Sequence, residues 1–320
     1  MPEPGGALPR PAAHRGGAAH VLPLRDLGRA AGCPSALKVI TGRKLRDLRD
    51  ASGLPTSRVC RQLGFSQAKL NRIELGRQGC KVPDARALLA LYGVTDRDLV
   101  EEFVRLVEES LRPEYFQRWN DSVAEFFHPL LALEYAADQI RVYEPNYVPG
   151  LLQTPAYAAA VIRSEWPLRP QWDVERLVEL RMARQEQFRA QADRAANPRL
   201  WVAVREEALL WSVEDKAVLH EQLGRLIDAA WGGQVPVQVV SPRTMARVPI
   251  TQNITYLRFS AAELDDAVYT EQASSSIFLQ DRARVEHHLQ LLDRLAAVTR
   301  TPEQSLKWLQ EQQRRLEDGG

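Results

Sequence analysis

The sequence predicts an all-α domain of short helices near the N-terminus, followed by a larger α+β domain. Three observations lead to this fold class. The chain has 320 residues, more than one hydrophobic core usually serves, so two domains are expected. Glycine and proline separate several short helical patterns between residues 35 and 93. After residue 139, β-branched and aromatic runs alternate with helical patterns.

Composition indicates the limits of these domains. Residues 1–34 are rich in Pro, Gly and Ala without a sustained period, so we expect a disordered extension there. Residues 35–112 are assigned to the helical domain with its linker helix, and residues 113–320 to the α+β domain. The linker helix is expected over 96–112, because Thr95 and Asp98 resemble a capping box and Pro113 ends the pattern.

Composition argues against several classes of protein. No run of 18 uncharged apolar residues is present, and the N-terminus lacks the apolar segment of a secretory signal. The three cysteines show neither metal-ligand nor redox spacing, and a sparse odd set suits a reducing compartment. We therefore expect a cytoplasmic protein with no membrane contact, no metal and no cofactor.

The formal net charge of +1 conceals a polarised chain. Residues 35–93 carry 12 basic and 4 acidic side chains, whereas residues 94–144 carry 5 basic and 12 acidic ones. A compact basic block is typical of a protein that binds a polyanion, chiefly nucleic acid. A solvated charged surface explains the same block equally well, so the motif inside it has to decide.

The basic block contains the pattern of a helix-turn-helix. Two short helices are expected at Thr56–Leu63 and Gln67–Leu75, with Gly64 in the turn, where a positive φ is needed. Ser66 is placed to cap the second helix. The residues that should form the shared core are Val59, Leu63, Leu70 and Ile73, with Cys60 as a small buried residue.

The side of the second helix opposite Leu70 and Ile73 should face outward. It carries Gln67, Ala68, Asn71 and Arg72, with Lys69 on its flank. Asn and Gln pair with adenine, Arg pairs with guanine, and Ala contacts the thymine methyl group. Ser66 and Thr56 lie at the helix starts, and Arg43 and Arg58 are candidates for phosphate contacts. The sequence thus predicts binding to double-stranded DNA; the alternative is a solvated helix face.

Residues 45–76 follow the pattern LR-x-x-R-x-x-x-G-L and then LG-x-S-x-x-x-x-x-R-I-E-x-G. This segment resembles the XRE (lambda and 434 repressor-like) helix-turn-helix family. The resemblance implies a five-helix repressor-like domain, with an ion pair between Arg49 and Glu74. Thr56 departs from the pattern, since the family usually has a phosphate-contacting Gln there. Regulators with this motif bind successive major grooves as dimers, so we expect a homodimer.

The larger domain shows five strand patterns and several helix patterns. Strands are expected at 140–143, 200–204, 235–240, 254–259 and 267–270. Helices are expected at 155–163, 174–193, 213–231 and 281–298, and a last one begins with a capping box at Thr301-Pro302-Glu303-Gln304.

Four segments of this domain are distinctive: VPGLLQTPAYAAAVI (148–162), RMARQEQF (181–188), WVAVREEALLW (201–211) and AVYTE (267–271). They resemble the uncharacterised C-terminal domain attached to XRE-type regulators of filamentous high-GC Gram-positive bacteria. The resemblance implies a transcriptional regulator that often acts beside a small partner protein encoded nearby. A small molecule is the other candidate for the signal that this domain receives.

Polar residues set beside apolar runs are the candidates for a binding pocket. We expect six of them to converge on one cavity or partner groove: Gln153, Tyr157, Arg184, Glu206, Tyr269 and Glu271. Arg181 accompanies Arg184 on a helix whose Leu177 and Leu180 pack inward. The alternative is that these residues only form caps, turns and solvated charges.

Two further functions remain open on the residues alone. Glu206, Glu271, Tyr269 and Arg184 could support transferase or hydrolase chemistry on a nucleotide. The chain has no glycine-rich phosphate loop and no nucleophile elbow, so we expect no enzyme. The other alternative is an antitoxin-like member of a protein pair that regulates its own gene.

Overall fold

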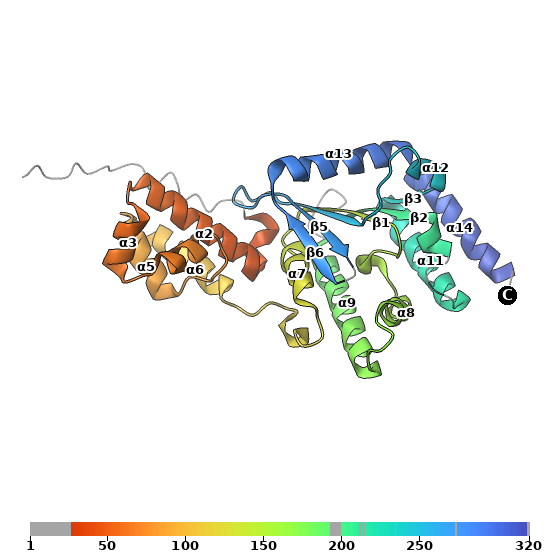
Figure 1. Ribbon diagram of the computed structural model, residues 1–320, viewed down its shortest axis with the longest axis horizontal. Coiled ribbons are helices and arrows are strands. Elements are labelled where there is room, and N and C mark those ends of the chain that lie inside the picture. Colours follow the sequence, from red (N-terminus) through yellow and green to blue (C-terminus); the bar gives the residue numbers. More distant parts are fainter. Residues whose placement is uncertain are drawn as a thin grey trace, which may run out of the picture. The chain divides into compact units, whose positions relative to one another are not determined.

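The structure is a computed structural model that describes residues 27–192, 200–210, 213, 215–233, 235–272 and 274–318. The chain divides into two compact units, drawn in Figure 1. Residues 37–111 form one unit, and residues 27–36 and 112–318 form the other. The first is helical and the second combines helices with a mixed sheet, which is the fold class predicted from the sequence.

Most of the segment predicted to be disordered, residues 1–26, lies outside the described residues. Its last residues are ordered, which corrects the expectation for them. Gly28–Gly32 form a 3-10 helix, and Ala30 and Cys33 are buried. The Cys33 thiol donates a hydrogen bond to the Ala132 carbonyl at 2.8 Å. Local composition could not indicate this, because the partner lies 99 residues further along the chain.

The helical unit consists of α2 (Pro34–Ala51, of which residues 37–51 belong to this unit), α3 (Thr56–Leu63), α4 (Gln67–Glu74), α5 (Val82–Leu91) and α6 (Arg97–Ser110). Leu45, Leu70, Leu88 and Phe103 are fully buried in its core, one from each of four helices. α6, the predicted linker helix, therefore packs into this core. Its N-cap is Asp96, not Thr95, and the Asp96 side chain accepts from two backbone N–H groups.

Two glycines allow α2 to approach the C-terminal end of α4 closely. A Cβ atom on Gly42 would lie 2.2 Å from the Ile73 carbonyl oxygen. Gly76 has φ +66°, and a Cβ there would lie 2.6 Å from the Cα atom of Val39. Backbone-to-backbone contact of this kind leaves no room for any other residue, so α4 is held in a fixed position against α2.

The larger unit is built on a six-stranded sheet in the order β3-β2-β1-β4-β5-β6. β1 (Gln139–Glu144), β2 (Leu200–Arg205) and β3 (Val237–Val240) are parallel. β4 (Ile254–Arg258), β5 (Ala267–Gln272) and β6 (Ser275–Leu279) continue the sheet in antiparallel pairs. Consequently β1 and β5 run in the same direction, with β4 between them, and their C-terminal ends reach the same edge of the sheet.

Helices cover both faces of this sheet (Figure 1). Tyr143, Ile254 and Val268 point to one face, where they pack against α13 (Arg282–Val298). The opposite face carries Val142, Thr255 and Tyr269, which lie in line across β1, β4 and β5. On this side lie α7 (His128–Glu134), α8 (Pro155–Glu165) and α9 (Gln171–Ala192).

The remaining elements precede β1, connect the strands or cover the end of the sheet at β3. They are the 3-10 helices η2 (Gln117–Trp119), η3 (Glu125–Phe127), η4 (Gly150–Leu152) and η5 (Trp231–Gly233), and the α-helices α10 (Glu206–Leu210), α11 (Lys216–Ala230), α12 (Pro242–Met245) and α14 (Pro302–Asp318). The five predicted strands and the predicted helices are present, whereas β6 was missed. Among the described residues, no helix combines the length and the apolar character needed to span a membrane.

Candidate nucleic-acid interface and polar cavity

The turn between α3 and α4 has the geometry that the sequence predicted. Gly64 ends α3 in the left-handed conformation, with φ 67° and ψ 28°. The Ser66 hydroxyl then accepts from the Lys69 N–H at 3.1 Å, so Ser66 is the N-cap of α4. Val59, Leu70 and Ile73 are buried between the two helices, as expected.

The opposite side of α4 is open to solvent. Gln67, Ala68, Asn71 and Arg72 are exposed on it, which fits their predicted role. Arg72 Nε donates to Gln78 Oε1 at 3.0 Å, an exposed contact that leaves the guanidinium reachable. Lys69 differs from its neighbours, because its ammonium group pairs with Asp84 at 2.7 Å and lies 3.7 Å from the centroid of the Phe65 ring. Lys69 therefore ties α4 to α5.

A polar hollow of about 480 Å³ lies beside α4. Its lining residues come from α2, α3 and α4: Arg46, Arg49, Thr56, Gln67, Ala68, Asn71 and Glu74. Thr56 is half-buried in this hollow, whereas the predicted phosphate contacts Arg43 and Arg58 do not line it. Arg46 was missed, although its position one helical turn before Arg49 could have indicated the shared face.

The floor of the hollow contains the ion pair between Arg49 and Glu74 that the resemblance implied. Arg49 Nε lies 2.7 Å from Glu74 Oε1, and Nη2 lies 3.0 Å from Oε2. The Arg49 side chain is only 12% exposed to solvent and the Glu74 side chain only 7%. The hydrogen bond to Glu74 raises the pKa of Arg49, against the opposing effect of burial. A bidentate contact of this kind fixes α2 against the end of α4.

The larger unit contains a cavity of about 650 Å³ at the sheet edge where β1 and β5 end. Its wall includes Glu144 of β1, Tyr269 and Glu271 of β5, and the segment 145–151 that follows β1. α7, α8 and α9 also contribute, with Glu165 and Arg181 among the charged groups, as do residues in the segments 122–127 and 251–255. Chain segments far apart in sequence thus line one cavity that has both polar and apolar walls.

A buried ion pair joins two of the helices in this wall. Arg184 on α9 contacts Glu134 on α7 through Nε–Oε2 and Nη2–Oε1, at 2.5 and 2.6 Å. Both residues are at most 9% exposed. Burial opposes the charge on Arg184, but the Glu134 carboxylate outweighs it and raises the pKa of the guanidinium. Arg184 therefore stays cationic and is neutralised by Glu134.

Comparison with known families supports this division of the chain. Residues 41–103 match a family model described as a helix-turn-helix domain. Residues 127–311 match the model of a domain of unknown function, DUF5753. The chain belongs to the DUF5753 family. No curated protein and no solved structure matches the chain.

Four of the six residues predicted to converge in the DUF5753 domain line its cavity: Gln153, Arg184, Tyr269 and Glu271. Tyr157 does not, which corrects the prediction. It is fully buried, and its hydroxyl accepts from the Val148 N–H at 3.1 Å. Gln153 also stabilises the wall itself, donating to the Val148 carbonyl and accepting from Arg181. The PGLLQT segment therefore contains residues, such as Gln153, whose contacts stabilise the fold.

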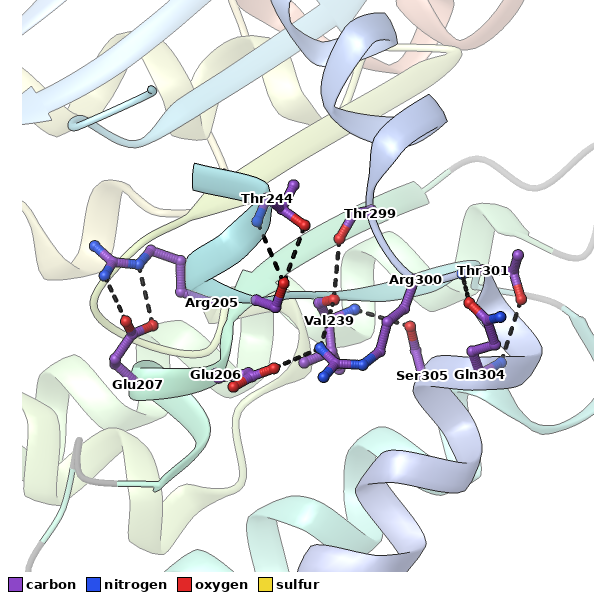
Figure 2. Close-up of polar contacts among 11 residues, drawn as sticks. Arg205, Glu206, Glu207, Val239, Thr244, Thr299, Arg300, Thr301, Gln304 and Ser305 are labelled. Atoms are coloured by element: carbon purple, nitrogen blue, oxygen red, sulfur yellow. Dashed lines mark hydrogen bonds and ion pairs between the residues drawn. The ribbon is translucent and has the colours of Figure 1, made fainter. Parts of the chain in front are cut away.

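Glu206 lies elsewhere in the DUF5753 domain, so its prediction was wrong. It begins α10 directly after β2 and pairs with Arg300 at 2.5 Å (Figure 2). Beside this pair, Thr299 donates to the Val239 carbonyl and the Val239 N–H donates to Ser305. The group fastens β3 to the junction of α13 and α14. The Glu206 carboxylate, which follows a strand, therefore has a structural role here.

The sequence did not single out Glu144 and Glu165, which line the cavity with Glu271. Burial, with the neighbouring Glu271, raises the pKa of Glu144 to about 8. Burial also raises the pKa of Glu165, and burial with Glu165 raises that of Glu271. Burial lowers the pKa of Arg181, and the nearby Arg184 lowers it further. The only local signal for Glu144 was its position at the end of a strand pattern.

Proposed function

We propose that this protein is a sequence-specific DNA-binding transcriptional regulator of the XRE type, in which α4 enters the major groove. The exposed row Gln67, Ala68, Asn71 and Arg72 carries the proposal. These residue types match the donors, acceptors and methyl groups that base pairs present in that groove. The cap at Ser66 and the Arg49–Glu74 pair hold the row on a rigid helix, as base recognition requires.

The polar hollow beside α4 is the proposed phosphate site. Arg46 of α2 and Thr56 at the start of α3 line it, together with Gln67, Ala68 and Asn71 of the row on α4. A phosphate oxygen placed there would accept hydrogen bonds from an exposed guanidinium and a hydroxyl. Such contacts position a protein on the duplex without selecting the base sequence. Thr56 replaces the longer Gln of the family pattern, so Arg46 is expected to carry more of this contact.

The DUF5753 domain is proposed to receive the signal, with its cavity as the binding site for a small molecule. The volume of about 650 Å³ and the mixed polar and apolar wall support this, since small-molecule sites have these properties. The regulator is proposed to act in the cytoplasm as a homodimer that binds two half-sites. A ligand would change DNA affinity only by binding two states of the protein unequally.

The test is selection of genomic DNA fragments by the purified full-length protein, followed by sequencing. One enriched motif is expected. Asn71→Ala and Arg72→Ala should each weaken binding to that motif by about 1–3 kcal/mol and relax preference at one base pair. Arg46→Ala should weaken all duplexes alike and reduce the salt dependence of binding.

Arg105→Ala is the matched control, because Arg105 is an exposed arginine on α6 that does not line the hollow. It should leave the affinity for the motif unchanged. Equal losses for Arg72→Ala on cognate and random duplexes would exclude Arg72 from base recognition. Absence of any enriched motif would contradict sequence-specific DNA binding altogether.

A further inference from the structure

The charges around the cavity of the DUF5753 domain do not balance. Arg184 is neutralised by Glu134, and Arg169 is neutralised by Asp173 at 2.5 Å. This leaves three carboxylates in the wall, Glu144, Glu165 and Glu271, none of which has an ion-pair partner among the described residues. Among the described residues of the lining, the cation that remains is Arg181, which donates to the neutral Gln153 amide at 2.5 Å. Because the pKa of Glu144 is about 8, this group is largely neutral at pH 7, and Glu165 and Glu271 set against Arg181 leave the described lining with a small excess of negative charge.

The sheet sets the spacing of the backbones of two of these residues. The register of β1, β4 and β5 aligns Glu144, Asn253 and Glu271 in one row, since Tyr143 pairs with Ile254 and Thr255 pairs with Tyr269. Across two strand spacings, the backbones of Glu144 and Glu271 lie roughly 10 Å apart. Asn253 lies between them, and its Oδ1 accepts from the Glu271 N–H at 2.8 Å.

This spacing bears on the kind of cation that could compensate the charge. Within the described part of the chain, no three His, Cys, Asp or Glu residues are grouped closely enough to hold a metal ion. A single ion therefore cannot contact all three carboxylates. An organic cation can place its charged group beside Glu271 and Glu165, which interact electrostatically, while its body fills the remaining space.

A second observation points to a ligand at the same place. Tyr269 lines the cavity and is 1% exposed, and among the described residues its hydroxyl makes no hydrogen bond of normal geometry, with Ser276 as the neighbouring polar group. The neighbouring Ser276 hydroxyl donates to the Phe126 carbonyl instead. A buried hydroxyl without a partner is costly, and a polar group of a ligand bound in the cavity would satisfy it. The wall also contains apolar side chains, among them Phe126, Ile162 and Leu177.

We propose that the cavity binds a small organic amine, with its ammonium group held by Glu271 and Glu165 and its apolar body against α8 and α9. The proposal rests on the proposed function, because it names the chemical class of the signal. An anionic ligand is disfavoured, since Arg184 and Arg169 are neutralised by carboxylates and the two carboxylates Glu165 and Glu271 outnumber Arg181 among the described lining residues. Glu144 and Asn253 would receive a further polar group of the same ligand.

The test uses three probes that differ only in charge around a common ring: phenethylamine, 2-phenylethanol and phenylacetate. Their affinities for the full-length protein are measured by ligand-observed NMR titration up to about 10 mM, the range expected for ligands of this size. The amine should bind about tenfold more tightly than the alcohol, and the carboxylate more weakly than both. Glu271→Gln and Glu165→Gln should each weaken amine binding about tenfold and leave binding of the alcohol unchanged.

Glu186→Gln is the matched control, because Glu186 is an exposed glutamate on α9 that does not line the cavity. It should leave the affinity for the amine unchanged. Binding of the carboxylate equal to that of the amine, or no amine binding in this range, would overturn the proposal. Equal weakening by Glu186→Gln would overturn it as well. Motif-specific DNA binding by the wild-type protein is measured separately, so either proposal can fail without the other.

Discussion

Replacing Glu74 with alanine should destabilise the helical unit strongly, because it leaves the Arg49 guanidinium without its main partner. The Arg49 side chain is only 12% exposed, so water entering from the hollow replaces the carboxylate only in part. Its remaining acidic contact is Asp50, at 2.7 Å, whose side chain is 56% exposed. An unpaired buried charge costs about 3–5 kcal/mol. With Asp50 retained, we expect about 3 kcal/mol for Glu74→Ala.

That free energy corresponds to a large shift in melting temperature. The unit contains residues 37–111, and in a domain of this size each kcal/mol lowers the midpoint by about 4–8 °C. Glu74→Ala should therefore lower the midpoint of this unit by about 12–24 °C. A replacement on the protein surface would change it far less.

The structure suggests an assay that separates the two units. All seven tryptophans lie C-terminal to Leu111, so tryptophan fluorescence reports only the larger unit. Hydrogen–deuterium exchange of peptides from α2 and α4 reports the helical unit. In the Glu74→Ala variant, these peptides should exchange at a lower temperature while the fluorescence transition stays in place.

Glu101→Ala is the matched control. Arg86 and Glu101 form an equally close bidentate pair, at 2.7 and 2.8 Å, but both side chains are exposed. Solvent and salt screen such a pair, so its removal should leave the exchange midpoint nearly unchanged. Equal shifts for Glu74→Ala and Glu101→Ala would refute the claim that burial makes the Arg49–Glu74 pair important.

Three further predictions follow from the same kind of argument. Gly42→Ala should unfold the helical unit or abolish DNA binding, because its Cβ would lie 2.2 Å from the Ile73 carbonyl oxygen; near-normal binding would contradict the close contact of α2 and α4. Glu134→Ala should lower the stability of the larger unit by about 3–5 kcal/mol in urea unfolding followed by tryptophan fluorescence, because Arg184 would be left buried and unpaired. Folded Glu144 has a pKa of about 8, above its unfolded value of about 4.3, so the folded state binds an extra proton between these pH values. Stability should fall as pH rises through this window and level off above it, and Glu144→Gln should reduce that slope; an unchanged slope would exclude Glu144 as its source.

The helix-turn-helix was predictable because its signals are local. Gly64 provides the positive φ of the turn, Ser66 caps the next helix, and the spacing of Leu70 and Ile73 defines the buried side. These effects act within a few residues, so the sequence determines them directly. β6 shows the limit of such signals: only Ile277, Phe278 and Leu279 of its five residues form an apolar run, which is too short to indicate a strand, and it forms by pairing with β5.

The cavity depends instead on which distant segments the sheet brings together. Glu144 and Glu206 each stand at the end of a strand, and nothing local distinguishes them. Glu144 is still in the sheet, opposite Val204 of β2, and its row continues through Asn253 to Glu271. Glu206 already belongs to α10, where it meets Arg300. Sequence determined that polar groups follow these strands, but only the strand order and register decided which of them share a cavity.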